Sequence, residues 1–260
     1  MNRYILHLAY RGTQFKGWQR QPDVPSIQER LEEALRQKYQ RPIPVHGCGR
    51  TDAGVHAVQF FAHADLPGPL LADARWVNEI AVYDSWAVPT KFHAQLDATH
   101  RSYSYLIHLD ERPEFLGLSS RFYREELEEP LLKECAIALV GRQDFRALCR
   151  QPDVYRSTIC EVVKAQWIFF DDKVLRFDIT ADRFLRGMVR ILVQRMWEVA
   201  QGKMSLSEWK AMLSGDVANS SRRAAYPDGL YLAGVRYPNR DILARKNLDL
   251  FGPVMAYLDC

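Results

Sequence analysis

The residues best suited to chemistry lie in one glycine-rich stretch, Gly47–Ala57, which reads Gly-Cys-Gly-Arg-Thr-Asp-Ala-Gly-Val-His-Ala. Its three glycines, Gly47, Gly49 and Gly54, permit backbone angles that side chains forbid and let another chain approach closely. The stretch also holds one acid, Asp52. An aspartate in such a loop either caps the turn with its own side chain or is presented to a ligand, and its residue type alone leaves both roles open.

The elements that must position this loop follow from hydrophobic periodicity. Alternation over Arg3–Tyr10 predicts a strand. Apolar residues at helical spacing over Ser26–Lys38, opened by a Ser-x-x-Glu capping box, predict a helix. The apolar, β-prone run Val58–Ala64 predicts a second strand directly after the loop. Asp52 is therefore expected at the mouth of a strand.

The later part of the chain shows a similar mixture of elements. A strand is expected to run through Leu109, and Arg101, Tyr103 and Tyr105 should share one of its faces because they lie two residues apart. In chain order, the pattern then predicts a helix over Pro130–Val140, an arginine-bearing loop over Asp144–Ser157, a hairpin of strands over Ile159–Phe170 and Val174–Thr180, helices over Arg183–Val199 and Ser205–Leu213, and a strand over Gly229–Tyr237.

The order of these elements is roughly β-α-β-β twice, with an extra helix late in the chain, and it lacks the glycine fingerprint of a dinucleotide-binding fold. We therefore predict an α+β protein with a mostly antiparallel β-sheet and helices packed on one side. We divide it into residues 1–100, which carry the aspartate loop, and residues 101–260, which carry the tyrosine and arginine motifs. The two halves are expected to share one continuous sheet.

The bulk properties exclude several classes of protein. The chain has 260 residues, of which 47% are hydrophobic and 26% charged, without an apolar run long enough for a membrane span and without a signal-peptide layout. We expect a cytoplasmic protein with no membrane partner. The five cysteines contain no Cys-x-x-Cys pair, which argues against a disulfide framework and a zinc ribbon. His46, His56 and His63 lack the i, i+4 spacing of a zinc helix, so no metal site is expected.

Two features bear on nucleic acid. The net charge of +3 is a weak indication of a polyanionic partner. The loop over Arg11–Pro22 interleaves arginines with aromatics, which suits single-stranded RNA because guanidinium groups meet phosphates and rings stack on bases. The alternative is a surface loop in which Phe15 and Trp18 turn inward.

Five segments together resemble the tRNA pseudouridine synthase A (TruA) family. Gly49–Ala57 is similar to the central signature of that family. The others are Tyr10–Pro22, similar to its N-terminal segment; Phe92-His-Ala and Arg101-Ser-Tyr-Ser-Tyr105, similar to its tyrosine motif; Phe184–Arg190, similar to its late arginine helix; and Gly229–Leu232, similar to its closing strand. These matches follow the order of the family and span nearly the whole chain.

The resemblance implies the pseudouridine synthase fold, with two similar α/β halves flanking a central cleft. It implies an isomerase that converts uridine to pseudouridine at positions 38, 39 and 40 of the tRNA anticodon stem-loop. Asp52 would be the catalytic nucleophile, Arg190 its ion-pair partner, and Tyr103 the residue that stacks on the target uracil. Arg50 is a second candidate cation at the substrate. The family is homodimeric and binds tRNA. Since the reaction imports no group and oxidises nothing, no cofactor is expected.

Some residues depart from the family pattern, and other functions remain to be weighed. Gln95 stands where the family usually has arginine, and the segment 76–82 is abbreviated, which bears on RNA contacts. A non-catalytic tRNA-binding or chaperone-like relative with the same fold is the main alternative. The joint presence of Arg50, Asp52, Tyr103 and Arg190 disfavours it. An aspartate-dependent hydrolase is disfavoured because no partner acid or metal-ligand set accompanies the aspartate. Basic residues in 11–20 and 144–156 are expected to hold phosphates.

Overall fold

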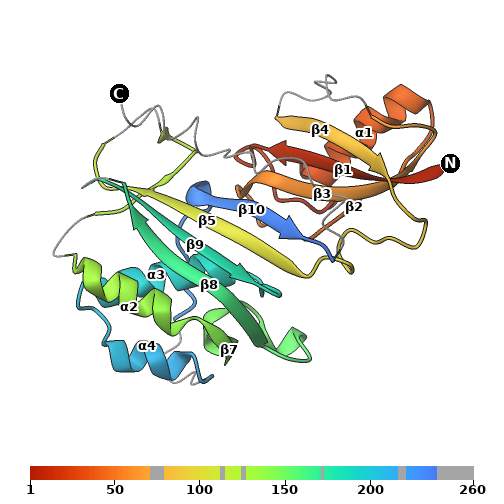
Figure 1. Cartoon of the computed structure of the whole chain (residues 1–260). Helices are drawn as coiled ribbons and strands as arrows, with labels where there is room; N and C mark the ends of the chain where they lie inside the picture. Colours follow the sequence, from red (N-terminus) through yellow and green to blue (C-terminus); the bar gives the residue numbers. More distant parts are fainter. Residues whose placement is uncertain (71–78, 112–114, 124–126, 171–172, 216–220, 239–260) are drawn as a thin grey trace.

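The computed structural model describes residues 1–70, 79–111, 115–123, 127–170, 173–215 and 221–238, and it shows a single ten-stranded sheet with helices packed against it (Figure 1). The strands are β1 (Asn2–Tyr10), β2 (His46–Gly47), β3 (His56–Leu66), β4 (Ile80–Ala87), β5 (His100–His108), β6 (Ser120–Arg121), β7 (Gly141–Asp144), β8 (Ile159–Phe169), β9 (Val174–Ala181) and β10 (Leu230–Arg236). The helices are α1 (Ile27–Tyr39), α2 (Glu129–Ala138), α3 (Met188–Ala200) and α4 (Leu206–Met212).

The sheet joins the early and late parts of the chain through β10. The main strand order is β4-β1-β3-β10-β5-β9-β8-β7, with β2 added beside β3 and β6 beside β5. All pairings are antiparallel except β3–β10 and β5–β6. In Figure 1 the blue strand β10 lies between the orange β3 and the yellow β5. The predicted α+β class with a mostly antiparallel sheet is confirmed.

One row of paired residues runs across the middle of the sheet, through strands β1, β3, β10 and β5. Tyr10 pairs with Ala57, Ala57 pairs with Leu232, and Leu232 pairs with Tyr103. Side chains of register partners point to the same face of a sheet. Tyr10 from the first strand and Tyr103 from β5 therefore share one face, although they lie 93 positions apart in the sequence (103 minus 10).

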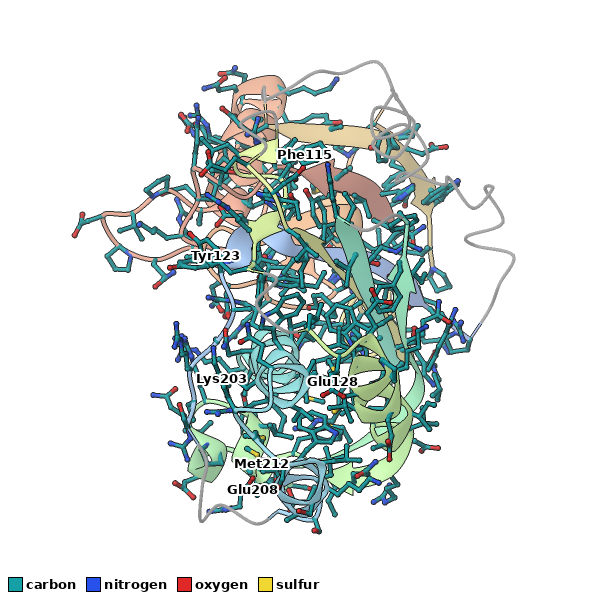
Figure 2. The ribbon with its side chains drawn as sticks, turned by 90° about the vertical axis from the view of Figure 1, so that its left-hand side faces the viewer. Phe115, Tyr123, Glu128, Lys203, Glu208 and Met212 are labelled. Atoms are coloured by element: carbon teal, nitrogen blue, oxygen red, sulfur yellow. The ribbon has the colours of Figure 1, made fainter. Side chains whose placement is uncertain are left out.

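Two hydrophobic clusters flank this row. The first is built from β1, β3 and α1, with Leu31 and Leu35 of the helix fully buried in it. The second surrounds α3 and includes buried residues of α2, α4, β5, β8 and β9. Tyr103 packs against both. Figure 2 shows α2 and α4 beside one another, with Glu128 at the start of α2 and Glu208 and Met212 on α4. The division near residue 100 stays a prediction.

Two of the predicted helices, α1 and α4, begin at the caps that the sequence predicts, and the start of a third, α3, needs a correction. Ser26 accepts a hydrogen bond from the Glu29 amide at the start of α1, and a reciprocal Ser205–Glu208 capping box opens α4. The helix predicted over Arg183–Val199 starts five residues too early, because α3 begins at Met188. Gly187 before it has φ 70°, a left-handed conformation that an α-helix cannot include. Arg183 therefore lies in the approach to the helix.

None of the helices in the described part of the chain combines the length and apolarity that a membrane crossing requires. The predicted hairpin of β8 and β9 is confirmed. Strand β4 (Ile80–Ala87) lies in a stretch for which the sequence pattern predicts neither a helix nor a strand. The polar tail from residue 239 lies outside the described residues.

Candidate active site

Asp52 and Arg190 meet where the aspartate loop faces the start of α3. The Arg190 Nη1 atom lies 3.6 Å from Asp52 Oδ2, and the two side chains are 12% and 31% exposed. The Nε atom of the same guanidinium donates to the Ala225 carbonyl at 2.7 Å. Burial lowers the pKa of Arg190 and the Asp52 charge raises it. Because an arginine side chain stays protonated in proteins, the carboxylate has a permanent cation beside it.

Tyr103 supplies an aromatic ring and a phenol close to this ion pair. Its ring meets Phe184 edge to face, with centroids 5.0 Å apart. Burial raises the pKa of Tyr103 well above its usual value, and negative charge at Cys48 and Asp52 raises it further. The phenol is therefore protonated at neutral pH. Among the described residues, its hydroxyl makes no hydrogen bond.

Arg50, the second candidate cation, occupies a different position. It is exposed, two residues before Asp52, and it makes no side-chain hydrogen bond or ion pair with another described residue. The structure thus pairs Asp52 with Arg190 and leaves Arg50 at the surface of the loop.

A second loop, residues 11–18, holds the aspartate loop by direct backbone contact. The Trp18 amide donates to Thr51 O at 3.2 Å, and the Gly54 amide donates to Phe15 O at 3.1 Å. A Cβ atom added at Gly12 would lie 2.0 Å from the Val55 carbonyl oxygen. Only glycine fits such an approach, which explains its presence in a loop far from Asp52 in sequence.

This contact decides the role of the two aromatic residues in the 11–18 loop. Phe15 and Trp18 are 5% and 3% exposed, and Trp18 stacks on Phe60 with centroids 4.1 Å apart. These two rings therefore do not lie where RNA bases could stack on them. The alternative, a surface loop in which Phe15 and Trp18 turn inward, is confirmed. Their burial anchors the loop that supports Asp52.

Arg101 is a further residue that organises the site. Its Nη2 atom donates to Cys48 O at 3.0 Å and to Gln95 O at 2.7 Å. Its Nη1 atom donates to Ala98 O at 2.9 Å and to Asp182 O at 3.3 Å. One guanidinium thus joins the start of the aspartate loop, the 95–98 loop and the end of β9. The sequence marks Arg101 as part of the tyrosine motif but gives no sign of these four carbonyl partners.

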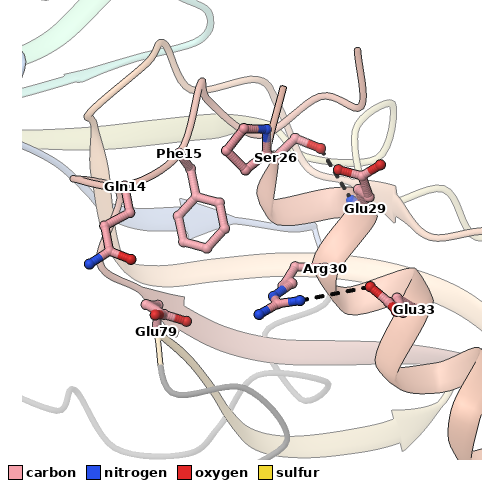
Figure 3. Close-up of a pocket in the computed structure, with 8 residues that line it drawn as sticks. Gln14, Phe15, Ser26, Glu29, Arg30, Glu33 and Glu79 are labelled. Atoms are coloured by element: carbon pink, nitrogen blue, oxygen red, sulfur yellow. Dashed lines mark hydrogen bonds and ion pairs between the residues drawn. The ribbon is translucent and has the colours of Figure 1, made fainter. Parts of the chain in front are cut away.

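A separate cavity of about 360 Å³ lies at the start of α1, and the residues that form the site do not line it (Figure 3). Its lining includes three glutamates, Glu29, Glu33 and Glu79, and one arginine, Arg30. This acidic lining does not suit a polyanion. Among the described residues, no group of three or more histidine, cysteine or acidic side chains is arranged to hold a metal ion.

The amino-acid sequence of the chain is similar to those of known proteins. Residues 135–238 match a family model described as tRNA pseudouridine synthase. The chain is 35% identical to tRNA pseudouridine synthase A of Porphyromonas gingivalis, over 92% of this chain and 98% of the relative. It is 37% identical to the protein of that name from Chromobacterium violaceum, over 91% and 94% of the two chains. The chain therefore belongs to the tRNA pseudouridine synthase A family.

Proposed function

We propose that this chain is a tRNA pseudouridine synthase that isomerises uridines 38, 39 and 40 in the anticodon stem-loop. The observation that carries the proposal is the Asp52 carboxylate held 3.6 Å from the Arg190 guanidinium, with Tyr103 beside it. The relatives named tRNA pseudouridine synthase A support the same reaction. We place the protein in the cytoplasm with its tRNA substrate and expect it to act as a homodimer.

The residue types suit the steps of this isomerisation. The N1–C1′ bond of uridine breaks, the uracil turns, C5 bonds to C1′, and the proton on C5 is released while N1 gains one. The sugar carbon that loses its base develops positive charge, which a nearby carboxylate stabilises or captures. Asp52 is the nucleophile in this proposal. No group is imported and the overall oxidation state is unchanged, so the chain's own residues suffice.

Arg190 and Tyr103 complete the proposed machinery. A carboxylate that is two-thirds buried stays ionised when a cation lies beside it, and Arg190 fills that place. The target base must leave its stack to reach Asp52, and the ring of Tyr103 would stack on the flipped uracil. The unpaired phenol of Tyr103 would take part in proton transfer at C5.

Pseudouridine mapping in tRNA tests the proposed function directly. We expect cells that lack this protein to lose pseudouridine at positions 38 to 40, and purified protein to release tritium from tRNA labelled at uridine C5. Binding of tRNA without any tritium release would instead support the non-catalytic relative.

Light scattering tests the proposed homodimer. It should give the mass of two chains, and a monomeric mass at working concentration would contradict the homodimer.

The Tyr103→Phe variant separates the ring from the hydroxyl. We expect a single-turnover rate about 10²-fold lower, the lower end of the range for general acid–base catalysis, with tRNA affinity unchanged because the ring remains. Tyr123→Phe, an exposed tyrosine on the described surface, is the matched control and should keep the wild-type rate. A wild-type rate in Tyr103→Phe would remove the phenol from proton transfer.

The Arg101→Lys variant tests the role of the four hydrogen bonds that the Arg101 guanidinium donates to backbone carbonyls. Lysine keeps the charge but cannot reach four carbonyls at once, so the aspartate loop should shift relative to β9. We expect the maximal rate to fall about 10²-fold, the cost of roughly 1 Å of misplacement, while the KM for tRNA stays within about twofold. Arg36→Lys on the exposed side of α1 is the control. A folded Arg101→Lys protein with the wild-type rate would contradict the positioning role.

A further inference from the structure

The segment 221–226 is held firmly although it lies in no helix or strand. Arg195 of α3 donates from Nε and Nη2 to the Ser221 carbonyl. Arg190 donates from Nε to the Ala225 carbonyl, and the Ala225 amide donates to Arg190 O at 3.0 Å. The hydroxyl of Tyr105 donates to Tyr226 O at 2.7 Å. These bonds restrain the backbone at both ends of the segment.

The side chains of Arg222, Arg223 and Tyr226 in this segment nevertheless face solvent. Tyr226 is 71% exposed, whereas its neighbour Ala225 is buried. Arg222 and Arg223 are also exposed, and within the described parts of the chain neither guanidinium has a hydrogen-bond or ion-pair partner. A free aromatic ring and two unneutralised charges on a restrained backbone form a preorganised surface, because little backbone entropy remains to be lost on binding.

The segment also lies next to the Asp52–Arg190 pair. Ala225 accepts from the guanidinium whose Nη1 atom faces Asp52. On the other side of Tyr226, Pro227 packs against the aspartate loop, since a Cβ added at Gly54 would lie 2.8 Å from Pro227 Cγ. Both neighbours of Tyr226 therefore touch the site. An RNA strand that delivers a nucleotide to Asp52 must pass close to this segment.

We propose that residues 221–226 form an RNA-contacting strip, in which Arg222 and Arg223 bind backbone phosphates and the ring of Tyr226 stacks on an unpaired base next to the target uridine. Guanidinium groups that bind phosphates, together with an exposed ring on which a base can stack, are the chemistry that recognises unpaired RNA. The proposal rests on the proposed function, from which it takes the substrate. It assigns phosphate and base contacts to a segment outside the loops 11–20 and 144–156.

Fluorescence anisotropy with a labelled anticodon stem-loop RNA, measured across a range of KCl concentrations, tests the strip. The plot of log affinity against log salt concentration has a negative slope, to which each single-strand phosphate contact contributes about −0.7. We therefore expect the Arg222→Gln/Arg223→Gln double variant to make this slope less steep by about 1 to 2. The matched control is Arg36→Gln/Arg41→Gln, which removes two exposed arginines at the end of α1 and should leave the slope unchanged.

Two substitutions at Tyr226 test the stacking. We expect Tyr226→Ala to weaken RNA binding about 5- to 100-fold, the range for loss of one base–aromatic stack, and Tyr226→Phe to bind within about twofold of wild type. Tyr123→Ala, which removes another exposed ring, is the control. Equal losses in Tyr226→Ala and Tyr226→Phe would overturn stacking, because only the hydroxyl would then matter.

The outcomes separate the strip from the proposed function. Unchanged affinity and salt slope in all strip variants, with tritium release by the wild-type protein, would overturn the strip and leave the enzyme standing. Tyr226-dependent RNA binding by a wild-type protein that releases no tritium would support the strip and overturn the enzyme. Circular dichroism melting of each variant shows whether it is folded.

Discussion

The Asp52→Asn variant is expected to lose pseudouridine formation by about 10⁴-fold or more, as enzymes do when a nucleophile is removed. Asparagine has nearly the size of aspartate and can still fill the loop. It carries no charge with which to stabilise or capture the sugar carbon, and it leaves Arg190 without its anion. Tritium release from C5-labelled tRNA under single-turnover conditions measures the loss. Binding of tRNA should persist, because the basic residues of the surface are unchanged.

The control for this variant is Asp23→Asn. Asp23 lies in an exposed turn with φ 59°, a left-handed conformation that asparagine also adopts readily, so the folded state should be unaffected. We expect the wild-type rate from it. Asp52→Ala should be as inactive as Asp52→Asn. Tritium release that survives in both Asp52 variants would end the role assigned to this carboxylate.

The sequence predicts the loop that carries Asp52 more readily than it predicts the partner of Asp52. The glycines and the acid are adjacent in the chain, so a local pattern reveals them. Arg190 lies 138 residues later (190 minus 52), and it reaches Asp52 because β10 pairs with β3 on one side and β5 on the other. Periodicity contains no information on that pairing. Only the resemblance to a family indicated the ion pair before the structure did.

The start of α3 shows why hydrophobic spacing misplaces a boundary. Leu185 is 4% exposed although it precedes the helix, so the apolar stripe continues past the point where the helix begins. The left-handed φ of Gly187 fixes that point, and a glycine within a helical pattern does not reveal its own φ. The 11–18 loop makes a similar point. Its composition suits RNA, yet its rings are buried under the aspartate loop, and composition cannot separate an exposed ring from an anchoring one.

The sequence does not mark segment 221–226 as functional, because the segment has no periodicity and no motif. Its importance comes from its partners, namely two arginines of α3 and Tyr105 of β5. A run of two arginines followed by a tyrosine is the only local signal, and it is short. The contacts that place such a segment beside a site are long-range, so they appear only once the chain is folded.

The second large effect is expected at Arg190, whose guanidinium contacts two different partners through two different nitrogen atoms. Its Nη1 atom faces Asp52, and its Nε atom holds the Ala225 carbonyl. Lysine has a single nitrogen at the end of a flexible chain and can satisfy only one of these partners. We expect Arg190→Lys to lower the single-turnover rate about 10²-fold through misplacement of the carboxylate. Arg190→Met, which also removes the charge, should lower it by at least about 10³-fold.

These variants should also unfold more easily, because the carbonyl of Ala225 loses its hydrogen-bond donor and the carboxylate of Asp52 loses the cation beside it. We expect the free energy of unfolding in urea to fall by about 1–3 kcal/mol, the cost of leaving one such group unsatisfied. Arg176→Lys is the control, since Arg176 pairs with Asp178 at 3.0 Å and both side chains are similarly shielded, but the pair lies within β9. It should keep the wild-type rate. If Arg190→Met matched the wild-type rate, Asp52 would need no cation beside it, and the ion pair would be a structural link between α3 and the aspartate loop.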